Sequence, residues 1–231
     1  MIILPAAAVG ISLVGGAVHG AYHRNSWVFG PVLGELPTDG KQISLTFDDG
    51  PNPDATPRIL DTLARQNVKA TFFILGAHAE RWPDLVHRVV AEGHQIGNHG
   101  YFHRKLHLKT PSYVKRDLIL GKRAIERAGG DTPRLFRAPH GFRNPWVSAI
   151  ASSLGERTVG WSLGVWDSAL PGAKAIVDRT IEGTRAGSII LLHDGDGYNA
   201  NGDRTQTADA VPGIVNGLRD RGFEFVTLPT Q

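Results

Sequence analysis

The sequence contains no cysteine among its 231 residues. This absence excludes disulfide bonds, thiolate metal sites and a thiol nucleophile, so any metal ion must be held by His, Asp or Glu. Clusters of like charge are also missing, because the 25 Lys and Arg residues are scattered and the net charge is only +3. A mildly basic chain without a basic patch does not indicate nucleic-acid binding.

Long apolar runs are absent except at the N-terminus. From Ile2 to Val18 every residue except Ser12 is apolar or small, a length between that of a signal-peptide core and a membrane span. A buried first helix and a misassigned start are the alternatives, and Arg24 behind the run argues against export of the remaining chain. We favour an uncleaved anchor.

This interpretation divides the chain into three parts. Residues 1–24 form a hydrophobic anchor or signal-like segment that enters the membrane through residues 2–22, residues 25–40 form a linker, and residues 41–231 form one globular domain. We expect a monomer outside the cytoplasm, membrane-anchored or secreted, with a cytoplasmic location as the alternative.

Strand and helix patterns alternate from residue 42 onward. This alternation predicts βα units around a mainly parallel sheet. About seven strands in one α/β domain fit an incomplete TIM-like (β/α)7 barrel better than an open sheet. The expected strands are 42–47, 69–75, 94–97, 134–137, 157–162, 188–192 and 223–228, and the expected helices are 56–67, 83–92, 112–128, 145–154, 173–185 and 206–221.

Ionisable residues follow these strands where each one ends. In a βα barrel the carboxyl ends of the strands meet at one rim, where such enzymes keep their active sites. Five separate clusters in the same topological position therefore predict a catalytic site. They are Asp48-Asp49, His99 with His103, Arg137 to Gly141, Asp167, and His193-Asp194.

Asp48, Asp49, His99 and His103 suggest a metal centre. Asp48 and Asp49 point in different directions at a strand end, so one can bind a metal while the other faces the substrate; a plain turn is the alternative. His99 and His103 are four residues apart and would share one face of a helical turn, although ten histidines also produce such pairs by chance. Two His, one carboxylate and a water are the usual layout of catalytic zinc.

The remaining clusters suggest acid and oxyanion chemistry. Arg137, Pro139 and Gly141 predict a rigid turn that aims the Arg at a carboxylate and frees backbone N–H groups for an oxyanion. The alternative is a surface cation. His193 is a candidate general acid, and the alternative is a strand-end His held by Asp194.

In this order, the motifs resemble the polysaccharide deacetylase family with the NodB homology domain, carbohydrate esterase family four. The resemblance covers residues 42–228. Thr46-Phe47-Asp48-Asp49-Gly50 is identical to the first motif, residues 189–195 are close to the last, and residues 161–167 followed by Pro171-Gly172 are similar to the fourth. No single element is specific, but the set is.

The resemblance implies a distorted barrel and one divalent metal, usually zinc, with Co²⁺, Ni²⁺ or Mn²⁺ as alternatives. By position, it implies that Asp49, His99 and His103 bind the metal. Asp48 would be the general base held by Arg137, and Asp167 would hold His193, the acid that protonates the departing amine. The backbone N–H of His140 would donate to the oxyanion, and Pro139, Gly141, Trp161 and Trp166 would line the substrate groove.

Three positions depart from the family pattern. Gly100 stands where Ser or Thr usually follows the first metal-binding His, which removes a hydrogen bond but no ligand. His140 replaces an aromatic residue, commonly Tyr. Ser168 replaces a Trp, and the nearby Trp166 is close enough to supply the missing aromatic surface. We expect these departures to alter the substrate groove, and therefore the substrate preference, and to leave the metal ligands in place.

The leading hypothesis is a hydrolase of carbon–nitrogen bonds other than peptide bonds. It would remove N-acetyl groups from GlcNAc-containing glycans such as peptidoglycan or chitin-like oligosaccharides. The alternatives are an O-acetyl esterase of the xylan type, a glycan-binding pseudoenzyme and a hydrolase of small amides. The sequence does not name the glycan, its length or the metal.

Overall fold

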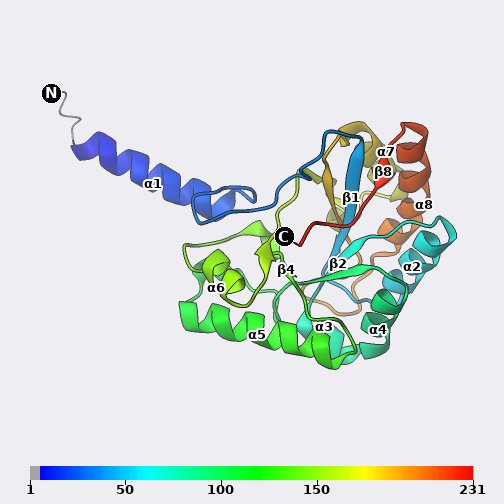
Figure 1. Cartoon of the computed structure of the whole chain (residues 1–231), viewed down its shortest axis with the longest axis horizontal. Coiled ribbons are helices and arrows are strands. Elements are labelled where there is room, and N and C mark those ends of the chain that lie inside the picture. The colour runs from blue at the N-terminus through cyan, green and yellow to red at the C-terminus, as the bar shows by residue number, and fades with distance from the viewer. Residues whose placement is uncertain (1–5, 231) are drawn as a thin grey trace.

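The computed structural model describes residues 6–230, with side chains from residue 14 onward. Seven strands run parallel in one curled sheet in the order β5-β4-β3-β2-β1-β7-β6, and β8 pairs with the start of β1 (Figure 1). This single-domain, incomplete barrel confirms the predicted fold class. The strands are β1 (Gln42–Asp48), β2 (Thr71–Ile74), β3 (Gln95–Asn98), β4 (Leu135–Phe136), β5 (Arg157–Thr158), β6 (Leu163–Gly164), β7 (Ile189–His193) and β8 (Glu224–Phe225).

Successive side chains of the central strand β1 face opposite sides of the sheet. Ile43, Leu45 and Phe47 are fully buried in the main apolar core. Successive strand residues point to opposite faces, so Thr46 and Asp48 turn to the other side, where both accept hydrogen bonds from Arg137. A second apolar cluster lies under that side and consists of Leu33, Leu36, Phe73, Leu135, Val159, Ile189 and Leu228.

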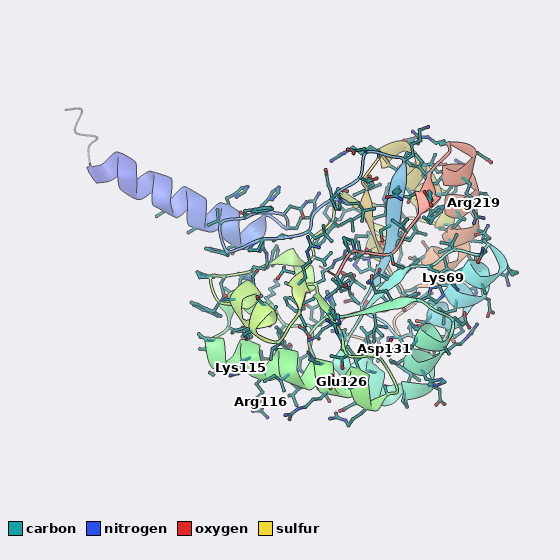
Figure 2. The ribbon with its side chains drawn as sticks, in the orientation of Figure 1. Lys69, Lys115, Arg116, Glu126, Asp131 and Arg219 are labelled. Carbon is teal, nitrogen blue, oxygen red and sulfur yellow. The ribbon has the colours of Figure 1, made fainter. Side chains whose placement is uncertain are left out.

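Helices cover the outside of the curled sheet (Figure 1). In α5, Val114 and Leu118 are buried, whereas Lys115 and Arg116 point outward (Figure 2), as expected of an amphipathic helix. The helices of the barrel are α2 (Ala55–Arg65), α3 (Gly76–Arg81), α4 (Pro83–Ala91), α5 (Pro111–Arg127), α6 (Val147–Ser153), α7 (Ala173–Gly183) and α8 (Thr205–Asp220).

The first helix, α1 (Ala6–Tyr22), projects away from the barrel in Figure 1. Its C-terminal end contacts the body: the Ala21 carbonyl accepts a hydrogen bond from the Arg143 N–H at 3.0 Å, and the Tyr22 and Phe142 rings lie 5.2 Å apart. Among residues 6–230 no helix has the length and apolar character needed to cross a membrane. Residues 2–5 of the expected anchor lie outside the described residues.

Residues 25–40 follow the barrel surface. Leu33 forms an isolated parallel bridge with Val159, and the Leu36 N–H donates to the Gly187 carbonyl at 2.8 Å. These contacts fix the path of the chain from α1 to β1.

Three elements differ from the prediction. The expected strand 157–162 is observed only as the two-residue β5, and the unpredicted β6 begins after that range, at the opposite edge of the sheet. The chain crosses between the two edges, since the Val159 N–H still donates to Phe136 of β4 but the Ser162 N–H donates to Ile189 of β7. Helix α3 was not predicted, since six residues that begin with Gly76 carry no helical periodicity. Three short 3₁₀ turns, Leu106–Leu108, Pro139–Gly141 and Asp167–Ala169, also lie in segments that were expected to be loops.

Candidate active site

A groove of about 650 Å³ lies at the carboxyl ends of the strands. It collects side chains from all five sequence clusters, as the barrel topology requires. Of the predicted site residues, those that line it are Asp48, Asp49, His99, His103, His140, Trp161, Trp166, Asp167 and His193, whereas Arg137, Pro139 and Gly141 lie behind its wall.

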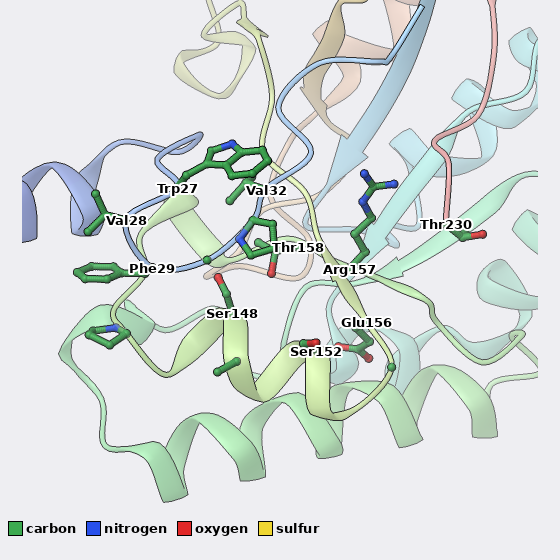
Figure 3. A pocket seen from close by; sticks show the side chains of 15 residues that line it. Trp27, Val28, Phe29, Val32, Ser148, Ser152, Glu156, Arg157, Thr158 and Thr230 are labelled. Carbon is green, nitrogen blue, oxygen red and sulfur yellow. The ribbon is translucent and has the colours of Figure 1, made fainter.

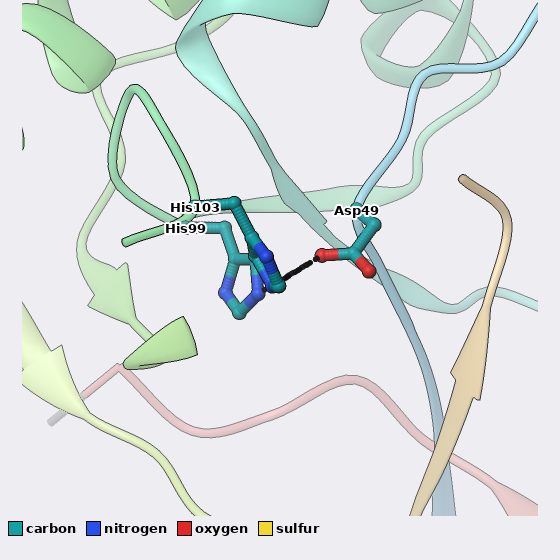
Figure 4. Close-up of side chains that lie close together, drawn as sticks. All are labelled: Asp49, His99 and His103. Carbon is teal, nitrogen blue, oxygen red and sulfur yellow. Dashed lines mark ion pairs between the residues drawn. The ribbon is translucent and has the colours of Figure 1, made fainter. Parts of the chain in front are cut away.

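Three of these side chains converge on one point (Figure 4). The Asp49 Oδ1 atom lies 3.2 Å from the His99 Nε2 atom and 3.1 Å from the His103 Nε2 atom. All three residues are buried, and one ligand atom from each lies within 4.8 Å of the others. A tetrahedral zinc ion, with bonds of 2.0–2.1 Å, separates its ligand atoms by roughly 3.4 Å. The spacing therefore suits one small cation.

The hydrogen bonds of His99 favour a cation at this point. Its Nδ1 lies 2.8 Å from the Arg137 carbonyl oxygen, and a carbonyl can only accept, so Nδ1 carries the hydrogen. The neutral ring then turns the Nε2 lone pair toward the Asp49 carboxylate. Asp49 Oδ1 is buried without a hydrogen-bond partner in the described chain. A metal ion satisfies both lone pairs, and a carbonyl behind the metal-binding His is the usual support.

Electrostatics keep Asp49 ionised. Burial raises the pKa of its carboxyl group, but the His103 and His99 imidazoles, when protonated in place of a bound cation, outweigh burial and hold that pKa well below its ordinary value. An ionised carboxylate is the form that binds metal.

The loop from His99 to His103 is not the predicted helical turn. It is irregular, with φ of +78° at Gly100 and +52° at His103, so the spacing identified the pair but not its geometry. Asp117 of α5 braces the loop by accepting the Tyr101 N–H at 3.1 Å. A Cβ atom at position 100 would lie 2.5 Å from Asp117 Oδ2. Glycine at this position therefore leaves room for the Asp117 carboxylate.

Asp48 pairs with a buried cation. Its Oδ1 accepts from Arg137 Nη1 at 2.7 Å, and Arg137 also donates to Thr46 Oγ1 and to the Gly160 carbonyl, each at 2.8 Å. Arg137 has no exposed surface, which overturns the alternative of a surface cation. Burial lowers the pKa of its guanidinium, and the charge of Asp48 opposes that shift. Asp48 is thus held in one orientation beside the metal ligands.

His193 is held by Asp167 and not by Asp194. Its Nδ1 lies 2.8 Å from Asp167 Oδ1, while Asp194 accepts from Thr56 Oγ1 at 2.6 Å. Burial lowers the pKa of the His193 imidazole, but the charge and hydrogen bond of Asp167 outweigh burial and raise that pKa to about 9. The imidazole is therefore protonated at neutral pH and can donate a proton from Nε2.

The turn after β4 exposes a backbone donor. Pro139–Gly141 form the 3₁₀ turn in which His140 has a φ of +62°. Its backbone N–H has no acceptor within the described part of the chain, and its ring lies 4.6 Å from the His103 ring. A free N–H beside a metal ligand suits an oxyanion. Burial, followed by the charge of His103, lowers the pKa of the His140 ring to about 4, so the ring is neutral.

The groove walls combine the predicted Trp166 with residues that the sequence did not suggest. Trp166 is 75% exposed at the rim, as is Tyr198 at 67%, and Tyr198 OH lies 2.9 Å from His140 Nε2. Tyr22, at the end of α1, and the following residues His23 and Arg24 also line the groove. No periodicity marks Tyr198 or these three residues, since contacts between segments 58 to 137 residues apart leave no local pattern. Exposed aromatic rings in a groove are suited to stacking on sugar rings.

A second cavity, of about 890 Å³, lies between residues 27–32 and α6 (Figure 3). It shares no lining residue with the groove and contains none of the predicted site residues. The candidate metal ligands Asp49, His99 and His103, together with Asp48 and His193, belong to the smaller groove.

Comparison with known proteins adds three similarities. Residues 35–159 match the family model described as polysaccharide deacetylase. The chain is 39% identical over 204 residues to a peptidoglycan-N-acetylglucosamine deacetylase of Bacillus cereus, covering 86% of this chain and 92% of that protein. It is 41% identical over 198 residues to a chitooligosaccharide deacetylase of Sinorhizobium fredii, covering 83% and 92%.

A solved structure is also similar. A peptidoglycan N-acetylglucosamine deacetylase in complex with 4-naphthalen-1-yl-N-oxidanyl-benzamide superposes with a TM-score of 0.78 at 34% identity. The superposition covers 85% of this chain and 90% of that one.

Proposed function

Since this chain belongs to the polysaccharide deacetylase family, we propose that it hydrolyses the N-acetyl groups of GlcNAc-containing glycans. The single observation that carries this proposal is the buried Asp49–His99–His103 cluster. It lies in the same groove as a carboxylate paired with Arg137 and an imidazole paired with Asp167. Peptidoglycan and chitin-like oligosaccharides are the proposed substrates, by analogy with the relatives.

The donor set fits one divalent metal, and we propose zinc, with cobalt, nickel and manganese as alternatives. When bound by Asp49, His99 and His103, it would polarise the acetyl carbonyl and make water acidic enough to attack near neutral pH. No thiolate is present to favour a softer metal.

The chain's own residues supply the proton transfers. Asp48, oriented by Arg137 at 2.7 Å, accepts the proton of the attacking water. The backbone N–H of His140 donates a hydrogen bond to the carbonyl oxygen as negative charge develops there. His193, protonated through Asp167, donates its Nε2 proton to the amine nitrogen as the C–N bond breaks, because an amine anion is a poor leaving group.

The groove walls and the N-terminus complete the proposal. Trp161 and Trp166 would contact the sugar rings, with Pro139 and Gly141 fixing the oxyanion turn behind them. We place the enzyme outside the cytoplasm, where the glycans named for its relatives lie, and propose that residues 2–22 tether a monomer to the membrane.

Acetate release from a matched glycan panel tests the function. The panel contains chitotetraose, peptidoglycan glycan strands and acetylxylan, each with chelator and after zinc add-back. Release from the first two that stops with chelator and returns with zinc supports a metal-dependent N-deacetylase. Release from acetylxylan alone indicates an O-acetyl esterase.

Asp48→Asn separates an enzyme from a binding pseudoenzyme. The variant keeps the side-chain shape but not the base, so turnover should fall by about 10²–10⁴-fold. Glycan binding without turnover in the parent, and the same behaviour in Asp48→Asn, would make the chain a pseudoenzyme.

A further inference from the structure

The residues that precede the family domain enter the active site. Tyr22 to Asn25 lie outside the matched residues 35–159, yet Tyr22, His23 and Arg24 line the groove. Asn25 binds the backbone of Trp161, a residue of the groove wall. Its Nδ2 donates to the Trp161 carbonyl at 3.0 Å, and its Oδ1 accepts from the Trp161 N–H at 3.2 Å. One side chain thus pairs with both polar backbone groups of one residue.

Two glycines leave room for this side chain. A Cβ atom at position 160 would lie 2.0 Å from Asn25 Oδ1, and one at position 34 would lie 2.6 Å from Asn25 Cγ. Real Cβ atoms do not approach so closely, so glycine at positions 34 and 160 provides the space that the Asn25 side chain occupies.

Arg24 reinforces the same contact. Its Nε donates to the Trp161 carbonyl at 2.8 Å, and its guanidinium carbon lies 5.3 Å from the centre of the Trp161 ring. A cation above an aromatic face is attractive, so Trp161 is held through both its backbone and its ring.

A chain of hydrogen bonds connects residues 160–162 to the catalytic base Asp48. The Gly160 N–H donates to Leu33 and the Ser162 N–H to Ile189, but the Trp161 N–H between them is satisfied by Asn25. The Gly160 carbonyl, which belongs to the same peptide group as the Trp161 N–H, accepts from Arg137 Nη2 at 2.8 Å. Arg137 in turn holds Asp48 through its other terminal nitrogen.

We propose that Asn25 is a positioning residue for the reaction: its clamp on Trp161 fixes the Gly160 carbonyl, which orients Arg137 and thereby the Asp48 carboxylate. The active site therefore begins about ten residues before the family domain. The inference rests on the proposed function, because Asp48 matters as a base only if the chain hydrolyses acetyl groups. No hydrogen bond or ion pair in the described structure joins Asp49, His99 or His103 to residues 160–162. The clamp reaches Asp48 through the Arg137 guanidinium, whereas His99 contacts the Arg137 backbone carbonyl, so we expect a larger effect on the base than on metal binding.

Two variants of the full chain test the clamp, with steady-state deacetylation and zinc affinity as readouts. Asn25→Ala removes both hydrogen bonds, and Asn25→Asp keeps the shape but loses the Nδ2 donor. A displacement of about 1 Å near reacting groups lowers rates by about 10²-fold, so we expect kcat to fall between about tenfold and a hundredfold in both. KM should change less than kcat, and zinc affinity should stay within about twofold of the parent. Trp27→Ala, two residues along and 71% exposed, is the control and should keep the parental kcat.

The outcomes separate the alternatives. A parental kcat in both variants overturns the inference, as does a parallel loss of zinc affinity, which would indicate a general loosening of the site. Unfolding of both variants would make Asn25 a purely structural residue and would also overturn it. If the parent chain itself releases no acetate from any glycan, the proposed function fails instead.

Discussion

Asp167→Asn should produce a defect that depends on pH. The raised pKa of His193, about 9 against an ordinary 6.5, comes chiefly from the charge of Asp167 acting against burial. This difference corresponds to about 3.4 kcal/mol. Asn keeps an oxygen at hydrogen-bond distance from His193 Nδ1 but removes the charge, so the pKa should return to about 6.5 or below.

The size of the defect follows from the fraction of protonated acid. At pH 8 a group with a pKa of about 9 is roughly 90% protonated, and one with a pKa of about 6.5 roughly 3%, a ratio of about thirtyfold. At pH 6 the same two groups differ by less than about twofold. The assay is kcat for acetate release between pH 5 and pH 10, where the parent should lose activity above about pH 9.

A control separates charge from hydrogen bonding. Thr207 donates to Asp167 Oδ2 at 2.9 Å, and Thr207→Val removes this bond but leaves the carboxylate charge. Its alkaline limb should therefore stay near that of the parent. An equal loss of activity at pH 6 and pH 8 in Asp167→Asn would refute the assignment of His193 as an acid tuned by Asp167.

Three further predictions concern the metal loop and the buried acid beneath it. Zinc should not restore chelated His103→Ala, and its zinc affinity by calorimetry should fall by more than the roughly 10–100-fold typical of an outer-shell partner; equal affinity would exclude His103 as a ligand. The zinc affinity of Asp117→Ala should fall by an amount within that 10–100-fold range, because the Tyr101 N–H loses its acceptor. An unchanged zinc affinity would show that Asp117 is not needed to hold the loop from His99 to His103. Burial raises the pKa of Glu156 to about 8, so its ionisation destabilises the fold increasingly between about pH 4.5 and pH 8. Glu156→Gln can still accept from Asn98, so it should raise the free energy of unfolding by about 2 kcal/mol or more at pH 9 and by little at pH 5. Denaturant unfolding at both pH values measures this difference. An equal effect at the two pH values would contradict the prediction.

The sequence predicted those parts of the site that depend on strand ends. Asp48 and His193 end strands of a parallel sheet and Arg137 directly follows one, and parallel strands bring such positions to one edge whatever the details of packing. The predicted alternation does not account for Asp49, which follows the end of β1 with a φ of +73°. This turn lets Asp49 contact His99 and His103 while Asp48 pairs with Arg137.

Contacts between distant segments could not be predicted. The hydrogen bonds of Arg24 and Asn25 span 137 and 136 residues, and no periodicity encodes them. The same segment explains why the expected strand 157–162 ends early, since the Gly160 N–H pairs with Leu33 and the Trp161 N–H with the Asn25 side chain instead of a neighbouring strand. The loop from His99 to His103 was misjudged for a related reason: its shape depends on Asp117 in the following helix.

The complete burial of Arg137 has a consequence for how the enzyme divides its free energy between folding and turnover. In water, solvent dipoles would reorient around the base each time its charge changed. Here a permanent cation with fixed partners occupies their place, so that reorientation is completed once, when the chain folds, and is absent from every catalytic cycle. An apolar residue at position 137 alone would leave the buried Asp48 carboxylate unpaired and destabilise the fold. Apolar replacement of both residues would avoid that penalty but would remove the base.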